Sequence, residues 1–154
     1  MNVIADGLPQ VQPSPQRPRP IVSVRTAPFW DAARRGELVI QRCRDCGTFF
    51  HPPVPVCMRC HSLDLGFAAV SGRGAVQSFS VMRGSPPPGF EQVTPYAVLA
   101  VELDEQPRLI VMANLVGAAP DGLRIGDRVR AVFEAEDDGF VYPMFELDPD
   151  GGRR

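Results

Sequence analysis

Four cysteines constrain the fold of this sequence more than any other feature. They form a C-x2-C pair, a gap of ten residues and a second C-x2-C pair, at Cys43, Cys46, Cys57 and Cys60. Each pair lets two sulfurs reach one ion from a tight turn, and two facing pairs complete a tetrahedron. The spacing therefore predicts a zinc ribbon in which all four thiolates bind one structural Zn2+ ion.

Two alternatives to structural zinc stay open at this point. Iron in a rubredoxin-like site uses the same four thiolates, and a redox-active dithiol is a third interpretation. His61 directly follows Cys60, but four cysteines already complete the ligand shell, so we expect a surface histidine there. A closed four-cysteine site has no open position for water or substrate, so the ion is expected to stabilise the fold and not to catalyse.

Composition places the chain among ordinary globular proteins. It has 154 residues with 44% hydrophobic and 22% charged content, enough for one domain or two small ones. No apolar run approaches the roughly 20 residues of a membrane-spanning helix, and the first 20 residues lack the pattern of a secretory signal. We therefore expect a cytoplasmic location and no membrane partner.

Charge argues against a dedicated nucleic-acid binder, because the formal net charge is −2 and such proteins usually carry a basic surface. All 16 basic residues are arginine. Arginine favours planar, bidentate contacts to carboxylates and phosphates.

Composition and hydrophobic periodicity divide the chain into four segments. Residues 1–24 are rich in proline, and we expect a flexible, extended arm. Residues 25–65 are predicted to contain a short helix, over 28–35, and the zinc ribbon. An OB-fold is expected over 66–148 and a disordered tail over 149–154.

From residue 66 onward, apolar residues recur with the period of two that is typical of half-buried strands. Clusters of glycine and proline separate five predicted strands. Five strands in so short a stretch fit a small closed barrel of the OB type, and the fold class is mainly β. The predicted strands are Ala75–Met82, Tyr96–Leu103, Leu109–Leu115, Arg128–Glu136 and Val141–Leu147.

Catalytic motifs are missing from the sequence. No thiol remains for nucleophilic catalysis once the four cysteines bind a metal, and the sequence has no G-x-S-x-G, H-E-x-x-H or P-loop motif. The acidic residues Glu134, Glu136, Asp137 and Asp138 lie at or beside a predicted turn, where we expect them to be solvated. The isolated chain is therefore not expected to be an enzyme.

The order of motifs resembles the DUF35 family over about residues 27–147. The resemblance rests on the two cysteine pairs and on short stretches before, between and after them. It implies a rubredoxin-like zinc ribbon followed by an OB-fold. The stretches include Phe29-Trp30, Gly36-Glu37-Leu38, Cys43-Arg44-Asp45-Cys46-Gly47, His51-Pro52-Pro53, Cys57-Met58-Arg59-Cys60 and Thr94-Pro95-Tyr96.

The family resemblance also implies a function. DUF35 proteins are similar to small partner subunits of thiolase-superfamily enzymes, including thiolases and CoA-dependent aldolases of lipid or steroid side-chain degradation. This chain is accordingly expected to be a non-catalytic accessory subunit in a heterotetramer. Its thiolase-like partner would carry the catalytic residues, and this chain would help bind the acyl-CoA substrate at the interface.

Six residues are candidates for contacts with the partner or the ligand. The aromatic pair Phe29 and Trp30 is expected either to anchor the partner or to pack on the chain's own ribbon. Four arginines are candidates for CoA phosphates or an acidic partner surface, although solvated arginines are common. These are Arg42, Arg44, Arg59 and Arg83.

Two other functions remain as alternatives. Zinc ribbons and OB-folds also bind single-stranded nucleic acid, and four aromatic residues on the predicted strands are candidate stacking platforms. A stand-alone acyl-CoA-binding module is the second alternative. The stacking candidates are Phe79, Tyr96, Phe133 and Tyr142.

Overall fold

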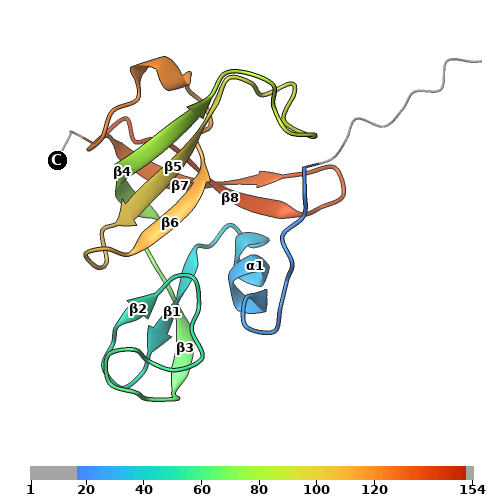
Figure 1. The fold of residues 1–154 in the computed structure, drawn as a ribbon. Coiled ribbons are helices and arrows are strands. Elements are labelled where there is room, and N and C mark those ends of the chain that lie inside the picture. Colours follow the sequence, from blue (N-terminus) through green and yellow to red (C-terminus); the bar gives the residue numbers. More distant parts are fainter. Residues whose placement is uncertain (1–16, 152–154) are drawn as a thin grey trace, which may run out of the picture.

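The computed structural model describes residues 17–151, which form two antiparallel sheets, one helix and one short 3-10 helix (Figure 1). The ribbon sheet has the strand order β2-β1-β3, and the barrel sheet has the order β6-β5-β4-β7-β8. None of the helices in this part of the chain is long and apolar enough to cross a membrane. The elements are α1 (Ala27–Ala33), β1 (Val39–Cys43), β2 (Phe49–Phe50), β3 (Leu65–Ala69), β4 (Arg73–Met82), β5 (Tyr96–Leu103), β6 (Ile110–Asn114), η1 (Pro120–Gly122), β7 (Arg128–Ala135) and β8 (Val141–Leu147).

The second sheet curls into a nearly closed five-stranded barrel. A parallel bridge between Leu115 and Phe145 joins the end of β6 to β8, and the Val116 amide donates to the Phe145 carbonyl at 2.8 Å. The sequence-based prediction of a five-stranded OB-type barrel is confirmed, with each strand end within two residues of its predicted position.

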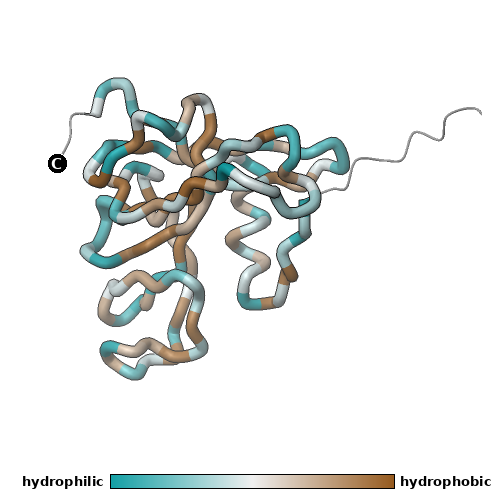
Figure 2. Tube along the Cα trace, turned by 45° about the horizontal axis from the view of Figure 1, so that its top comes forward, coloured by the Kyte–Doolittle hydropathy of each residue, from teal (hydrophilic) through white to brown (hydrophobic). Residues whose placement is uncertain are grey.

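Strand β5 shows why these residues form a barrel. Its buried residues alternate with half-buried ones along the strand, so one face of the pleat points inward. The buried set Ala97, Leu99, Val101 and Leu103 packs in one cluster with Phe145 of β8. Figure 2 shows hydrophobic residues along the strands and hydrophilic residues in many of the outer turns.

Two residues at the start of the ribbon, Leu38 just before β1 and Ile40 within it, join the ribbon to the barrel core. Leu38 and Ile40 are 4% and 0% exposed and belong to the same hydrophobic cluster as the barrel residues. The neighbouring Gln41 is also buried, and its side-chain amide pairs with both backbone groups of Val54 at 2.7 and 3.0 Å. The ribbon therefore shares a core with the barrel.

In the ribbon, the structure differs from the sequence-based prediction. The third ribbon strand, β3, pairs with β1 over Leu65–Ala69, so the ribbon sheet runs past the segment boundary expected between residues 65 and 66. Its half-buried residues show no strict alternation, which is why the pattern did not reveal a strand. The helix begins at Ala27 and ends at Ala33.

Part of the proline-rich arm packs on the hairpin between β7 and β8. Arg17 lies 3.5 Å from both Glu134 and Glu136, and Arg19 pairs with Asp138. Three of the acidic residues expected to be solvated therefore contact the arm. The predictions for residues 1–16 and 152–154 lie outside the described part of the chain.

Candidate metal centre and its surroundings

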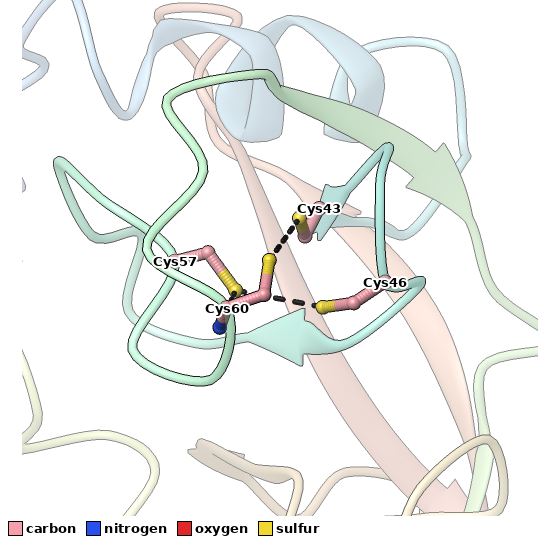
Figure 3. A group of neighbouring side chains, drawn as sticks. All are labelled: Cys43, Cys46, Cys57 and Cys60. Atoms are coloured by element: carbon pink, nitrogen blue, oxygen red, sulfur yellow. Dashed lines mark hydrogen bonds between the residues drawn. The ribbon is translucent and has the colours of Figure 1, made fainter.

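The ribbon brings the four cysteine sulfurs into one cluster (Figure 3). All four Sγ atoms lie within 4.8 Å of one another. The Cys43 and Cys60 sulfurs are 3.7 Å apart and the Cys46 and Cys57 sulfurs 3.5 Å apart. Tetrahedral zinc with bonds of about 2.3 Å requires sulfurs about 3.8 Å apart, so the cluster fits one zinc ion.

Two equivalent turns place these sulfurs. The Gly47 amide donates to the Cys43 carbonyl at 2.9 Å, and the His61 amide donates to the Cys57 carbonyl at the same distance. Gly47 and His61 both adopt left-handed backbone angles, with φ of 74° and 61°. His61 is exposed and occupies the glycine position of the second turn, and the metal cluster among residues 17–151 consists of cysteines alone.

The pKa values of two of the cysteines, Cys46 and Cys60, are shifted in opposite directions. Hydrogen bonding to Thr48, through its side chain and then its backbone, lowers the pKa of Cys46 to about 6. At Cys60 a backbone hydrogen bond from Ser62 acts in the same direction. Desolvation and the other three thiols outweigh it and raise the Cys60 pKa to about 12. Four thiolate charges this close would repel one another, and a bound cation would offset that repulsion.

Two of the candidate arginines flank a groove of about 300 Å3 beside the first cysteine turn. The Arg42 Nε donates to the Gly47 carbonyl at 3.0 Å, and its guanidinium lies 5.2 Å from the centroid of the Phe49 ring. Arg44 forms an exposed ion pair with Asp64 at 2.9 Å. Both arginines thus already have partners, yet both remain exposed.

The other two candidate arginines lie elsewhere. The Arg59 Nη1 is 3.4 Å from the Thr48 hydroxyl, so this residue connects the second cysteine turn to the first. Arg83 follows β4 on the barrel and pairs with Asp121 of η1 at 2.6 Å. The structure therefore gathers Arg42, Arg44 and Arg59 around the ribbon and keeps Arg83 apart.

The aromatic pair of helix α1 packs within the molecule. Phe29 and Trp30 meet edge to face at 5.0 Å, and Phe29 lies 5.3 Å from the His51 ring of the ribbon. Trp30 lies 5.2 Å from Phe140 and 6.4 Å from Tyr142, which belong to the barrel hairpin. The helix thus bridges the ribbon and the barrel, and of the two expected roles, partner anchor or packing on the ribbon, the contacts within the chain include the second.

Beside this helix is a cavity of about 360 Å3, which we call the junction pocket. It is lined by residues of the arm, α1, the ribbon loop, β6 and β8, including Ile21, Trp30, Pro52, Met112 and Tyr142. Three of the lining residues are candidates from the sequence: Phe29 and Trp30 as contacts for a partner or ligand, and Tyr142 as a stacking residue. The other lining residues come from segments that are far apart in the sequence, so no local sequence pattern could reveal that they converge.

The aromatic residues considered for nucleic-acid stacking make contacts inside the fold. Phe79 and Phe133 pack against the hydrophobic cluster, and Tyr96 stacks on Phe90 at 5.0 Å. Tyr142 lies against Trp30 and Phe140. They do not form a shared, open stacking surface.

The fold and the cysteine cluster define a protein in which a zinc-ribbon module is followed by an OB-type barrel. Residues 30–66 match the family model described as "ChsH2, rubredoxin-like zinc ribbon domain". Residues 68–134 match the model described as "ChsH2, C-terminal OB-fold domain". The chain belongs to the DUF35 family, as its sequence motifs indicated.

Three curated relatives are similar to this chain. It is 41% identical over 134 residues to a "Probable enoyl-CoA hydratase alpha subunit" of Thermomonospora curvata, covering 87% of this chain and 41% of that protein. It is 39% identical to the "3-oxo-4,17-pregnadiene-20-carboxyl-CoA hydratase alpha subunit" of Mycobacterium tuberculosis, covering 80% and 38%. The chain thus spans about two fifths of the length of these two relatives. A "DUF35 domain-containing scaffold protein" of Methanothermobacter thermautotrophicus is 34% identical, with 75% and 89% covered.

A solved structure is similar as well. A chain of the structure described as "Ltp2-ChsH2(DUF35) aldolase" superposes with a TM-score of 0.77 at 39% identity. The match covers 84% of this chain and 98% of that chain.

Proposed function

We propose that this chain is a non-catalytic accessory subunit of a thiolase-superfamily enzyme that acts on acyl-CoA thioesters. The observation that carries the proposal is the likeness to nearly the whole length of a chain in the Ltp2-ChsH2(DUF35) aldolase structure, with a TM-score of 0.77. Two relatives named as subunits of CoA-thioester hydratases and one named as a scaffold protein support it.

The thiols of the chain support a non-catalytic role. All four cysteines belong to one cluster, so a metal ion there would leave no thiol to act as a nucleophile. We assign no hydratase activity to this chain, because the chain spans only 41% and 38% of the two hydratase subunits. The reaction would instead take place on the partner.

Within this proposal, Cys43, Cys46, Cys57 and Cys60 hold one structural Zn2+ ion. The sulfur spacing and the family model of a zinc ribbon support this assignment. Four thiolates complete the tetrahedral shell, so the ion would stabilise the two turns without binding substrate.

The ribbon arginines are the proposed contacts for an anionic group of CoA or for an acidic partner surface. Arg42 and Arg44 line one groove, and Arg59 reaches the first cysteine turn. Arg83 would need a separate contact, because it lies on the barrel. For Phe29 and Trp30, the proposed role is to shape the surface that the helix presents between ribbon and barrel.

The proposal extends to the substrate and to the subunit assembly. We propose an acyl-CoA of lipid or steroid side-chain degradation, bound with help from this chain, and a cytoplasmic heterotetramer of two accessory and two catalytic subunits. The names of the M. tuberculosis relative and of the aldolase structure support this choice of substrate class and partner.

Co-expression tests the proposed function. A thiolase-superfamily protein from the same genome is tagged, co-expressed and purified with the untagged chain. We expect the chain to remain bound and the complex to act on acyl-CoA thioesters, whereas the chain alone should show no activity. Failure to co-purify would contradict the proposal.

Calorimetry separates an accessory subunit from a stand-alone acyl-CoA-binding module. CoA is titrated into the isolated chain and into the complex. An accessory subunit should bind CoA measurably only within the complex, while equal binding by the isolated chain would favour the stand-alone module.

A further inference from the structure

The junction pocket has the properties of a small-molecule site. Its volume of about 360 Å3 lies within the range of known ligand sites, roughly 300–1,000 Å3. It forms where arm, helix, ribbon and barrel meet, and such boundaries between structural units are preferred places for ligand sites.

The lining of the pocket is apolar and uncharged. Aromatic, aliphatic and proline side chains make up most of it, and none of its described lining residues is aspartate, glutamate or arginine. Its polar groups include Asn114 and His51, and burial lowers the pKa of His51 and so favours the neutral ring. The Tyr142 hydroxyl is buried without a hydrogen-bond partner among the described residues. The described lining residues therefore offer no charged side chain to balance an ionic ligand.

Flat side chains shape one wall. Phe29 and Trp30 meet at 89°, and the His51 ring lies 5.3 Å from Phe29. Aromatic faces and edges pack well against another ring. This wall therefore offers aromatic surface against which a ring can pack.

The arm also contributes to the lining. Pro20 and Ile21 line the pocket, directly after Arg19, which pairs with Asp138 and lies 4.7 Å from the Phe140 ring centroid. At the rim, Ile21 is 93% exposed and Met112 is 67% exposed. An apolar rim around an apolar pocket suits a ligand with low affinity for water.

We propose that the junction pocket binds an uncharged, ring-bearing small molecule, with the ring against Phe29 and Trp30 and a hydroxyl or carbonyl group at Asn114. The proposal is separate from the accessory-subunit function, because it requires neither a partner protein nor CoA. A failure of one therefore leaves the other intact.

The test uses 2-naphthol as the probe and the full, zinc-loaded chain. Calorimetry measures its affinity, and the emission of Trp30, the single tryptophan of the sequence, reports whether the probe is close. We expect saturable binding of one probe molecule with quenching of Trp30. Asn114→Leu should weaken binding about fivefold by removing the polar contact, and Met112→Glu should weaken it at least as much by placing a carboxylate at the rim.

Met82→Glu is the matched control, because Met82 is also an exposed strand methionine but does not line the pocket. It should leave the affinity unchanged. Should Asn114→Leu fail to fold, Met112→Glu decides alone, since Met112 is exposed. No saturable binding at about 1 mM probe, or equal affinity in the pocket and control variants, would overturn the proposal.

Discussion

Asp148 shows at the scale of one residue how burial changes the contribution of an ion pair. Its side chain is 1% exposed and lies 2.5 Å from the Arg73 guanidinium. Asp121 is 67% exposed and pairs with Arg83, which is 58% exposed. A buried carboxylate depends on its partner, because water cannot replace the lost contact.

Asp148→Ala should therefore lower the free energy of unfolding by about 2 kcal/mol. Asp121→Ala, the matched control, should change it by about 0.5 kcal/mol or less, because exposed ion pairs contribute little. Urea unfolding followed by circular dichroism measures both values. Equal effects of the two variants would refute this explanation.

His51 should make stability depend on pH. Burial lowers its pKa in the folded chain, so below the ordinary value of about 6.5 the unfolded chain binds more protons than the folded one. Stability therefore rises with pH across this window and is lost as the pH falls below about 6.5. We expect a lower urea midpoint at about pH 5.5 than at about pH 7.5.

His51→Gln provides the control for this pH dependence, because glutamine does not titrate. The loss of stability between the two pH values should be smaller in this variant. Identical pH dependence in both chains would show that other groups cause it.

At the scale of elements, the arm and the β7–β8 hairpin form a charged contact. Glu136→Gln together with Asp138→Asn removes acidic partners of Arg17 and Arg19 without changing the arm. The arm should then move more freely, with NMR order parameters at Arg19 and Ile21 falling from about 0.85 to below about 0.6. Glu146→Gln on β8 breaks a different ion pair, with Arg130, and should leave the arm rigid.

The ribbon and the barrel should lose stability together when the metal is removed. Zinc binding by four thiolates contributes roughly 10–16 kcal/mol, which is comparable to the whole stability of a domain. Leu38 and Ile40 connect the ribbon to the barrel core. Cys57→Ser should therefore abolish bound zinc and lower the melting temperature of the barrel as well.

Metal analysis and thermal unfolding measure this coupling and also separate zinc from iron. His61→Ala is the control, because His61 lies outside the cysteine cluster and should leave one metal ion per chain. A Cys57→Ser chain that still held one equivalent would contradict the four-cysteine site.

For the whole molecule, much of the fold was predictable from local patterns. Alternation located the barrel strands, as in β5, and the cysteine spacing located the cluster. The arm contact was not predictable, because Arg17 and Glu134 are far apart in sequence and nothing local pairs them. The same holds for the junction pocket, whose lining residues converge only after the fold has formed.

Native mass spectrometry of the chain co-expressed with the proposed thiolase-like partner tests the central claim most directly. The account predicts a complex of two catalytic and two accessory subunits, with one zinc ion for each accessory chain. A chain that remains at its monomer mass of 16.8 kDa in the presence of the folded partner would contradict the account.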